Sequence, residues 1–336
     1  MREYRLHEFK GFDSLALCEA PIPVPGPSEV LVKVHAVSLQ QRDLVVAKGQ
    51  YPKPLQPGIV PASDMAGEIV AIGSEVTNFS VGERVCANFA MPAFIFGDLG
   101  AETDGVLCEY KIFEADPQRL IKFPNHLTYQ EASTLPCAAL TAYAALYGPV
   151  PVQGGDVVLI QGTSGVSIFS LQFALGAGAT VIITSSSDEK LQIAKRLGAH
   201  HVINYNTNPD WDQEVMKITN GHGANIVIDI GGASTLIKSI KSASFGGWVQ
   251  MVGVIGHGPA DLNTLPIFVI SKNLCLRGVL MGGMERFNRM NRMVDSLKLR
   301  PYIDTKVFAF GDAAKAFEHM DGRSHVGKVV IQVAEE

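Results

Sequence analysis

A glycine-rich turn between an apolar strand and a helix constrains this chain more than any other feature of its sequence. Residues 157–160 are apolar and lead directly into the turn, an apolar-faced helix follows, and a second strand is expected at 180–184. A strand-to-helix turn collects backbone N–H groups and the positive end of a helix at one point, which suits a pyrophosphate. We therefore predict that a dinucleotide binds at the turn residues Gly162, Thr163, Ser164, Gly165 and Val166.

The turn departs from the full G-x-G-x-x-G fingerprint. Only Gly162 matches, because Ser164 and Ser167 occupy the positions of the later glycines. Gly165 can still allow a close approach of the backbone to a ligand. A turn that uses glycine for its geometry alone is the alternative. The spacing to the second strand favours the binding interpretation.

The end of the second strand indicates which dinucleotide binds. An NAD site usually presents an acidic side chain there to the ribose 2′-OH. This chain offers Ser185 and Ser186, with Lys190 close behind. Hydroxyls and an ammonium can bind a 2′-phosphate, so we predict NADP(H). Two observations compete: Ser186 can cap the next helix in a capping box with Glu189, and Asp188 would oppose a phosphate if it turned inward.

The pattern along the chain changes near residue 125. Before that point, short β segments at 30–36, 67–72 and 83–87 are separated by glycine and proline, which is typical of a compact β-barrel. After about residue 130, strands alternate with helical stretches, which predicts a parallel sheet. The strands expected there are 157–160, 180–184, 201–203, 225–230, 248–252 and 274–280. A last helix at 312–320 and a strand at 327–333 are expected to pack back onto the N-terminal half.

Composition narrows the class of protein. The 336 residues are enough for two domains, and the net charge of −5 gives no reason to expect nucleic acid or an anionic membrane as a partner. The N-terminus lacks the apolar segment of a signal peptide, and no apolar run is long enough to span a bilayer. The five cysteines are odd in number and form no C-x-x-C pair. We therefore expect a cytoplasmic protein without a disulfide framework.

Motifs in order along nearly the whole chain resemble the medium-chain dehydrogenase/reductase superfamily, in its zinc-independent branch similar to quinone oxidoreductases and alcohol dehydrogenases. The matching segments are 36–43, 49–52, 63–67, 81–85, 134–142, 204–205 and 325–330. The resemblance implies an α/β fold in which a Rossmann doubly wound parallel sheet (residues 125–283) binds NADP. It also implies a GroES-like β-barrel catalytic domain (residues 1–124, completed by 284–336), with the active site in the cleft between the two domains.

The resemblance also assigns residues to the cofactor. It implies that Thr141 helps to hold it and that Ser185, Lys190 and Tyr205 surround the 2′-phosphate. Lys328, in the last matching segment, is included with them. Gly231, Val254 and Ile255 follow the fourth and fifth strands, where ligands bind in open α/β sheets. The edge strand near Leu274–Met284 usually joins two subunits in this family, so a homodimer is expected.

The positions of the family's zinc ligands are changed in this chain. Zinc-dependent members carry a cysteine, a His-Glu pair and a later cysteine or aspartate, but here the first region reads 38–43 without cysteine and the pair reads Ser63-Asp64. Cys137 stands alone at the later position. One thiolate and at most one aspartate cannot supply the usual three ligands. We predict no metal and interpret Cys137 as a small apolar residue lining the cleft; a ligand or a nucleophile is the alternative.

Without a metal, conjugated acceptors are favoured, because hydride transfer to a quinone or enone builds a delocalised charge. Tyr51 is the first candidate for a donor to the substrate oxygen, with Gln40 and Asp43 as further catalytic candidates; a solvent-exposed Tyr51 and an Arg42–Asp43 structural ion pair are the alternatives. His35 is interpreted as structural. The apolar loop 88–103 either caps an apolar substrate or belongs to the core.

These features together predict an NADPH-dependent oxidoreductase that transfers hydride to quinones, enones or other activated double bonds. The substrate is expected to be a small apolar or conjugated carbonyl compound. A zinc-free alcohol or carbonyl dehydrogenase and an NADPH-binding protein with little turnover are the alternatives.

Overall fold

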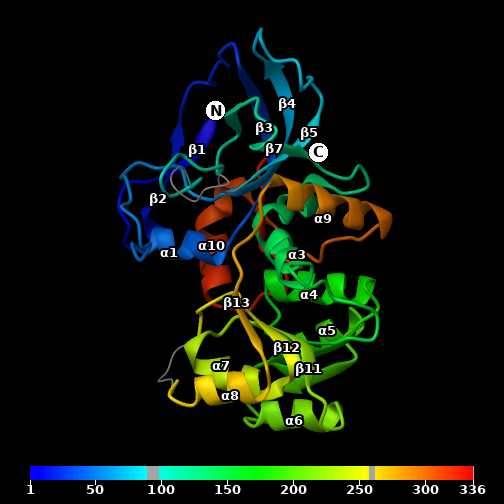
Figure 1. Cartoon of the computed structure of the whole chain (residues 1–336). Coiled ribbons are helices and arrows are strands. Elements are labelled where there is room, and N and C mark those ends of the chain that lie inside the picture. Colours follow the sequence, from blue (N-terminus) through cyan, green and yellow to red (C-terminus); the bar gives the residue numbers. More distant parts are fainter. Residues whose placement is uncertain (89–97, 257–261, 336) are drawn as a thin grey trace. The chain divides into compact units, whose positions relative to one another are not determined.

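The computed structural model describes residues 1–88, 98–256 and 262–335, and these form two compact units (Figure 1). Unit 1 comprises Met1–Leu140 and Gly282–Glu336, and unit 2 comprises Thr141–Met281. In the described part of the chain, no helix is both long and apolar enough to cross a membrane.

Unit 2 is built on a six-stranded parallel sheet with the order β10-β9-β8-β11-β12-β13. Its strands are β8 (Val157–Gln161), β9 (Thr180–Ser185), β10 (His201–Asn204), β11 (Ala224–Asp229), β12 (Ala243–Met251) and β13 (Cys275–Gly278). Its helices are α3 (Leu140–Leu146), α4 (Gly165–Gly176), α5 (Asp188–Arg196), α6 (Trp211–Ile218), α7 (Ala233–Ser242) and α8 (Leu265–Ser271). This is the doubly wound order, in which the strands added along the chain extend the sheet to one side of β8 and then, from β11 on, to the other side. The predicted Rossmann sheet is confirmed.

The interior of unit 2 explains why these segments form strands. Leu159, Ile182, Val227 and Val249 are fully buried in one apolar cluster, each on a different strand. β-branched and large aliphatic side chains suit strands that are covered on both faces. The parallel sheet therefore brings the carboxyl ends of β8, β9, β11 and β12 to the same edge.

Unit 1 contains a mainly antiparallel sheet with the order β14-β15-β3-β4-β5-β7, with β6 also paired to β3. Its strands are β1 (Arg2–Leu6), β2 (Leu15–Glu19), β3 (Glu29–Ser38), β4 (Asp64–Ile72), β5 (Arg84–Ala87), β6 (Tyr110–Glu114), β7 (Leu120–Lys122), β14 (Phe308–Ala309) and β15 (Val330–Gln332). Its helices of at least five residues are α1 (Gln41–Ala47), α2 (Tyr129–Ser133), the π-helical stretch Leu135–Ala139, α9 (Met284–Ser296) and α10 (Ala313–Asp321). β15 pairs antiparallel with β3, so the end of the chain does pack onto the N-terminal half.

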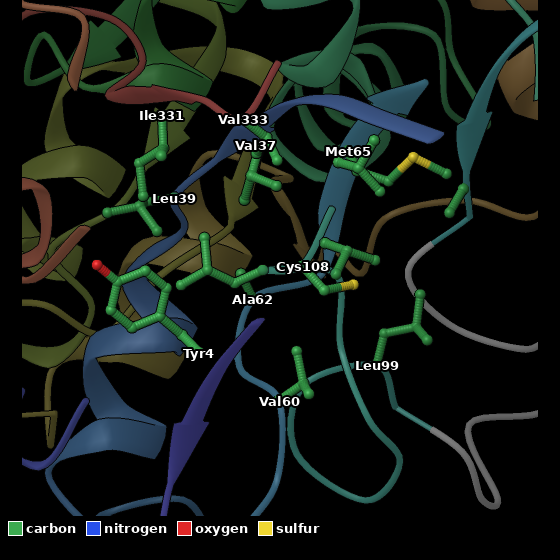
Figure 2. Packing of buried hydrophobic residues seen from close by; sticks show 14 of the residues in the cluster. Tyr4, Val37, Leu39, Val60, Ala62, Met65, Leu99, Cys108, Ile331 and Val333 are labelled. Carbon is green, nitrogen blue, oxygen red and sulfur yellow. The ribbon is translucent and has the colours of Figure 1, made fainter. Parts of the chain in front are cut away.

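Figure 2 shows the apolar core of unit 1. Side chains from distant segments meet there, including Tyr4 of β1, Val37 of β3, Met65 of β4 and Ile331 of β15. Because β3 lies between β15 and β4, its side chains contribute to the centre of this core. The strand also ends at Ser38, two residues before the predicted catalytic residue Gln40.

The first domain boundary lies later than predicted. Residues 125–140, expected in the Rossmann domain, belong to unit 1. The reason is packing: the Tyr129 ring of α2 stacks on His35 of β3 at 4.1 Å between ring centroids, and Ala132 accepts a hydrogen bond from Cys86. The stacking fits the structural role predicted for His35. The second boundary lies at 281/282, two residues from the predicted one.

Candidate functional site

The glycine turn of unit 2 has the geometry of a phosphate-binding loop. Gly162 has φ of +72°, a conformation that favours glycine, and a Cβ there would lie 2.9 Å from Cδ1 of Ile230. Ser164 is the N-cap residue of α4, whose 12 residues begin at Gly165. The first N–H groups of a helix have no partner within the helix, so this end can receive an anion.

Ser167 has a structural function that explains why it replaces a glycine. Its hydroxyl donates to the carbonyl of Gln161 at 2.7 Å, which fastens the first turn of α4 to the end of β8. The Gln161 side chain extends the connection, since its Oε1 accepts from the N–H groups of Ile230 and Gly231 at 3.2 and 3.3 Å. The two turns that follow β8 and β11 are thus joined through one residue.

Asp229 lies behind this connection and is completely buried. Its carboxylate accepts hydrogen bonds from the Gly232 N–H, the Thr235 and Ser239 hydroxyls and the Gln161 side-chain amide. A buried carboxylate with this many donors is well satisfied. The network, which our sequence analysis did not find, fixes the shape of the turn at Gly231.

The turns after β11 and β12 contain three predicted cofactor residues. The N–H groups of Ile255 and Gly256 donate to the carbonyls of Ile230 and Gly231 at 3.2 and 3.0 Å, so Gly231, Val254 and Ile255 lie close together. The side chain of Val254 is 84% exposed, which leaves it available to a ligand. Thr141, the first residue of unit 2, is buried in α3.

The end of β9 forms a polar shelf, by which we mean Ser185, Ser186, Lys190 and Tyr205. Ser185 is buried, and its carbonyl accepts from the Tyr205 N–H at 3.0 Å. Ser186 is exposed, and the Tyr205 side chain is 40% exposed. The strand end and the loop after β10 therefore bring Ser185 and Tyr205 together, with Ser186 next to Ser185 in the chain.

The helix after the shelf begins one residue later than we expected. Ser187, and not Ser186, is the N-cap residue of α5, and its hydroxyl accepts from the Lys190 N–H at 3.3 Å. The interpretation of Ser186 as a cap is therefore wrong, because β9 extends through Ser185 and shifts the start of the helix. The Ser186 hydroxyl is not used by the cap.

Both acidic residues at the start of α5 are held by hydrogen-bond donors. The Asp188 carboxylate accepts from Nδ2 of Asn204 at 2.8 Å, and the Glu189 carboxylate accepts from the Ser187 hydroxyl. The bond to Ser187 lowers the pKa of Glu189. Asn204 is a residue that the sequence analysis did not single out as functional.

Unit 1 gathers a second set of predicted residues in a buried polar cluster. The Gln40 side-chain amide donates to Asp64, the Ser63 hydroxyl donates to the same carboxylate at 2.8 Å, and so does the Cys137 backbone N–H at 3.0 Å. Asp64 is completely buried. These residues come from the start of α1, from β4 and from the stretch before α3, so the fold brings together positions that lie far apart in the sequence.

Two cations and a second carboxylate, Asp43, belong to the same cluster as Asp64. The buried Lys328 ammonium donates to the Leu39 carbonyl, and Arg42 lies 3.7 Å from Oδ1 of Asp43. Burial raises the pKa of Asp43 to about 6, although Arg42 opposes the shift. Burial also raises the pKa of Asp64 and lowers that of Lys328, while their mutual attraction opposes both shifts. Unlike the other predicted cofactor residues, Lys328 lies in unit 1.

Asp43 has a structural function that the sequence only partly indicated. Its Oδ2 accepts from the Gln40 N–H at 2.7 Å and so caps the start of α1. The expected Arg42–Asp43 ion pair is also present. One carboxylate oxygen of Asp43 thus caps the helix, and the other lies against Arg42.

Tyr51 is bound to a carboxylate that the sequence did not indicate. Its hydroxyl donates to Oδ2 of Asp98 at 2.7 Å, and Lys53 lies 3.1 Å from the same oxygen. Burial, and then the bond to Asp98, raise the pKa of Tyr51. The Arg42 guanidinium lies 5.6 Å from the centre of the Tyr51 ring, so Tyr51 and Asp43 contact the same cation. The predicted apolar loop residues Phe89, Met91, Phe94 and Phe96 lie outside the described residues.

Comparison with known proteins identifies the family. A family model described as "Alcohol dehydrogenase GroES-like domain" matches residues 26–125, and one described as "Zinc-binding dehydrogenase" matches residues 165–297. The chain is 40% identical to a zinc-type alcohol dehydrogenase-like protein of Schizosaccharomyces pombe, over 98% of this chain and 99% of that protein. The chain belongs to the medium-chain dehydrogenase/reductase superfamily. It is an oxidoreductase of this family, whose members bind a nicotinamide cofactor.

Other similar members of the superfamily carry names that describe different substrates and different cofactors. A 2-haloacrylate reductase of Burkholderia is 30% identical over 97% of each chain, and human quinone oxidoreductase is 29% identical over 98% of this chain and 97% of that protein. Among solved structures, an NAD-dependent alcohol dehydrogenase has a TM-score of 0.90 and 31% identity, covering 99% of this chain and 100% of the other. A mycobacterial protein in complex with NADPH has a TM-score of 0.81 and 27% identity, with the same coverage.

The buried cluster of unit 1 does not fit the zinc site of a medium-chain dehydrogenase. Zinc of this kind takes three nitrogen, sulfur or carboxylate ligands from the protein. The Gln40 amide and the Ser63 hydroxyl are not among these ligands, and the Asp64 carboxylate already accepts from three donors. Burial and then Asp64 raise the pKa of the Cys137 thiol to about 12. Within residues 1–88, 98–256 and 262–335, no group of three histidine, cysteine or acidic side chains is arranged to hold a metal.

Proposed function

We propose that this chain is an NADPH-dependent reductase of quinones, enones or other activated double bonds, and that it works without a metal. The observation that carries the proposal is the buried cluster around Asp64. Three hydrogen-bond donors and the nearby Lys328 ammonium satisfy this carboxylate where zinc-dependent members have their ligands. The cluster thus needs no Lewis acid to balance its charge.

The cofactor residues of unit 2 support NADP(H). The turn at Gly162 and the start of α4 offer backbone N–H groups to a pyrophosphate. The polar shelf offers the Ser186 hydroxyl and the Lys190 ammonium to a 2′-phosphate, and both nearby carboxylates are held by other donors. The turns at Gly231 and Val254 border the same edge of the sheet.

The chemistry of the acceptor follows from the groups that are present. The reduced nicotinamide supplies the hydride, and the protein has to orient the acceptor and exclude water. A conjugated acceptor spreads the resulting negative charge, so it needs no metal. Tyr51 is a weak acid whose proton is bound to Asp98, so we assign the final proton to water.

Two relatives act on substrates of this chemical class according to their names. One is a quinone oxidoreductase and the other a 2-haloacrylate reductase. The S. pombe relative and the NAD-dependent alcohol dehydrogenase favour a second candidate, a zinc-free alcohol or carbonyl dehydrogenase. An NADPH-binding protein with little turnover is the third.

A substrate panel distinguishes the three. NADPH oxidation is followed at 340 nm with quinones, enones, aldehydes and ketones, before and after treatment with a chelator, and the metal content of the purified protein is measured. We expect turnover with quinones or enones that the chelator leaves unchanged, together with substoichiometric zinc. Faster turnover with aldehydes or ketones would favour the second candidate, and tight NADPH binding without turnover the third. Stoichiometric zinc whose removal abolishes activity would refute the metal-free proposal.

A further inference from the structure

We infer that Asn204 sets the preference for a 2′-phosphorylated cofactor by hydrogen-bonding the Asp188 carboxylate, which restrains this charge against β10 and offsets part of it. The inference deepens the proposed function and rests on its assignment of NADPH. It makes Asn204 a positioning residue that acts through Asp188. Neither residue was among the predicted cofactor contacts.

The register of the sheet places Asn204 directly beside the shelf. In the parallel pair of β9 and β10, Asn204 is the partner of Ser185. Its Nδ2 donates to Oδ1 of Asp188 at 2.8 Å, and its Oδ1 accepts from the Asn206 N–H at 3.0 Å. Because both ends of the side-chain amide have partners, its orientation is fixed and the donor faces Asp188.

Asp188 is the residue whose charge decides between the two cofactors. It is exposed and begins α5 three residues after Ser185, close to where an NAD site presents an acid to the ribose 2′-OH. A 2′-phosphate carries between one and two negative charges, so a carboxylate pointing at it opposes binding. The bond to Asn204 directs the carboxylate toward β10 and offsets part of its charge.

The carboxylate of the neighbouring residue Glu189 is also restrained by a hydrogen bond. Glu189 is bound by the Ser187 hydroxyl within its own helix turn. The loop that carries Asn204 is further fastened to the shelf, because Nδ2 of Asn206 donates to the Ser186 carbonyl at 3.1 Å. Two carboxylates thus lie at the start of α5, where the helix dipole stabilises them. Asn204 and Ser187 restrain both by hydrogen bonds.

The inference is tested by measuring the dissociation constants of NADPH and NADH for the full-length chain by protein fluorescence. The variants are Asn204→Ala, Asp188→Asn and the double variant. Asn225→Ala is the matched control: Asn225 is also a hydrogen-bonding asparagine of unit 2, but it accepts from the Val157 N–H at the start of β8. It removes a side-chain hydrogen bond in the centre of the sheet, at the amino-terminal end of the strands and not at the carboxyl end where Asn204 lies.

We expect Asn204→Ala to weaken NADPH binding about tenfold, which is within the range of a repulsion between two close charges near a protein surface. NADH binding should stay equal or become tighter, because the released carboxylate can accept from a 2′-OH. The double variant should recover the wild-type preference, and Asn225→Ala should not change it. High salt should reduce the effect of Asn204→Ala on NADPH.

Two outcomes would overturn the inference. Equal weakening of NADPH and NADH binding by Asn204→Ala would show a structural role only, and so would a loss that Asp188→Asn does not repair. The wild-type preference is a separate readout. A wild-type chain that binds NADH more tightly than NADPH would refute the proposed cofactor, whereas a wild-type preference for NADPH that Asn204→Ala leaves unchanged would refute this inference alone.

Discussion

Four charged side chains lie together in unit 1, where each would be unfavourable alone. Arg42 and Lys328 balance Asp43 and Asp64, and Lys328, Asp43 and Asp64 are almost fully buried. Removing one partner of such a set leaves an unpaired buried charge, which is strongly destabilising. The cluster therefore has a structural function whatever its part in catalysis, and substitutions there have to preserve shape.

Asp43 makes the stability of the chain depend on pH. Its pKa is raised from 3.8 to about 6 by burial. A raised folded-state pKa means that its contribution to stability is fully present below about pH 3.8 and is lost as the pH rises through 6. Asp43→Asn, which keeps the cap acceptor, should therefore remove a pH-dependent loss of up to about 3 kcal/mol.

The measurement is urea unfolding of wild type and Asp43→Asn between pH 4.5 and 7.5. The free energy of unfolding of the variant should gain on that of the wild type as the pH rises. Asp13→Asn, at an exposed position in the same unit, should show no such trend. A constant difference across this range would contradict the shifted pKa.

Tyr51 provides a test of the source of the proton. A positioned acid contributes roughly a hundredfold to ten-thousandfold to a rate. Because the Tyr51 hydroxyl donates to Asp98 and its pKa is raised, we expect Tyr51→Phe to lower kcat less than tenfold. The check is kcat and its pH profile with the best acceptor, with Tyr110→Phe of the same unit as background. A hundredfold loss with an altered profile would restore Tyr51 as the donor.

At the scale of elements, the sequence predicted those strands whose bounds follow from a local pattern of apolar and turn residues. The strands β8, β9 and β10 each lie within one residue of their predicted bounds, because apolar runs between turn residues are a local signal. The helix α1 (Gln41–Ala47) was not predicted, since its core is the β-branched pair Val45-Val46. The start of α5 was misplaced by one residue, because three successive serines all suit a cap.

Contacts between distant segments were beyond local patterns. Nothing near Tyr51 in the sequence points to Asp98, and nothing near Asp188 points to Asn204. The helix α2 joined unit 1 through the stacking of Tyr129 on His35, which no spacing rule reveals. The sequence thus predicted the fold and named candidate residues, while the hydrogen-bond partners of these residues depended on tertiary packing.

The turn before α4 yields a prediction about this element. Gly162 and Gly155 both have positive φ, of +72° and +91°, but only at Gly162 would a Cβ meet a neighbour, Ile230. Each alanine substitution should cost about 1 kcal/mol in backbone strain. Gly162→Ala should in addition weaken cofactor binding severalfold, because the turn has to shift away from Ile230. Thermal unfolding and NADPH titration measure the two effects, and equal NADPH affinity in both variants would contradict the phosphate-loop assignment.

At the scale of the whole molecule, we expect association to involve one edge of the unit 2 sheet. Within the described residues, β13 ends the sheet, and the neighbouring helix α8 exposes Ile267 by 67% and Ile270 by 78%. Unpaired edges and apolar surface together favour association. We propose that two copies of the chain pair through this edge.

A charge on the edge strand tests the pairing. Cys275 is exposed on β13, so lysine there is compatible with the monomer, whereas edge lysines disfavour pairing with another strand. Two-fold symmetry would bring both new lysines to the same interface. Cys275→Lys should therefore convert a dimer into a monomer in analytical ultracentrifugation, and Val24→Lys, at a position 85% exposed in unit 1, should leave the dimer intact. A wild-type monomer would refute the dimer, and an unchanged Cys275→Lys dimer would place its interface elsewhere.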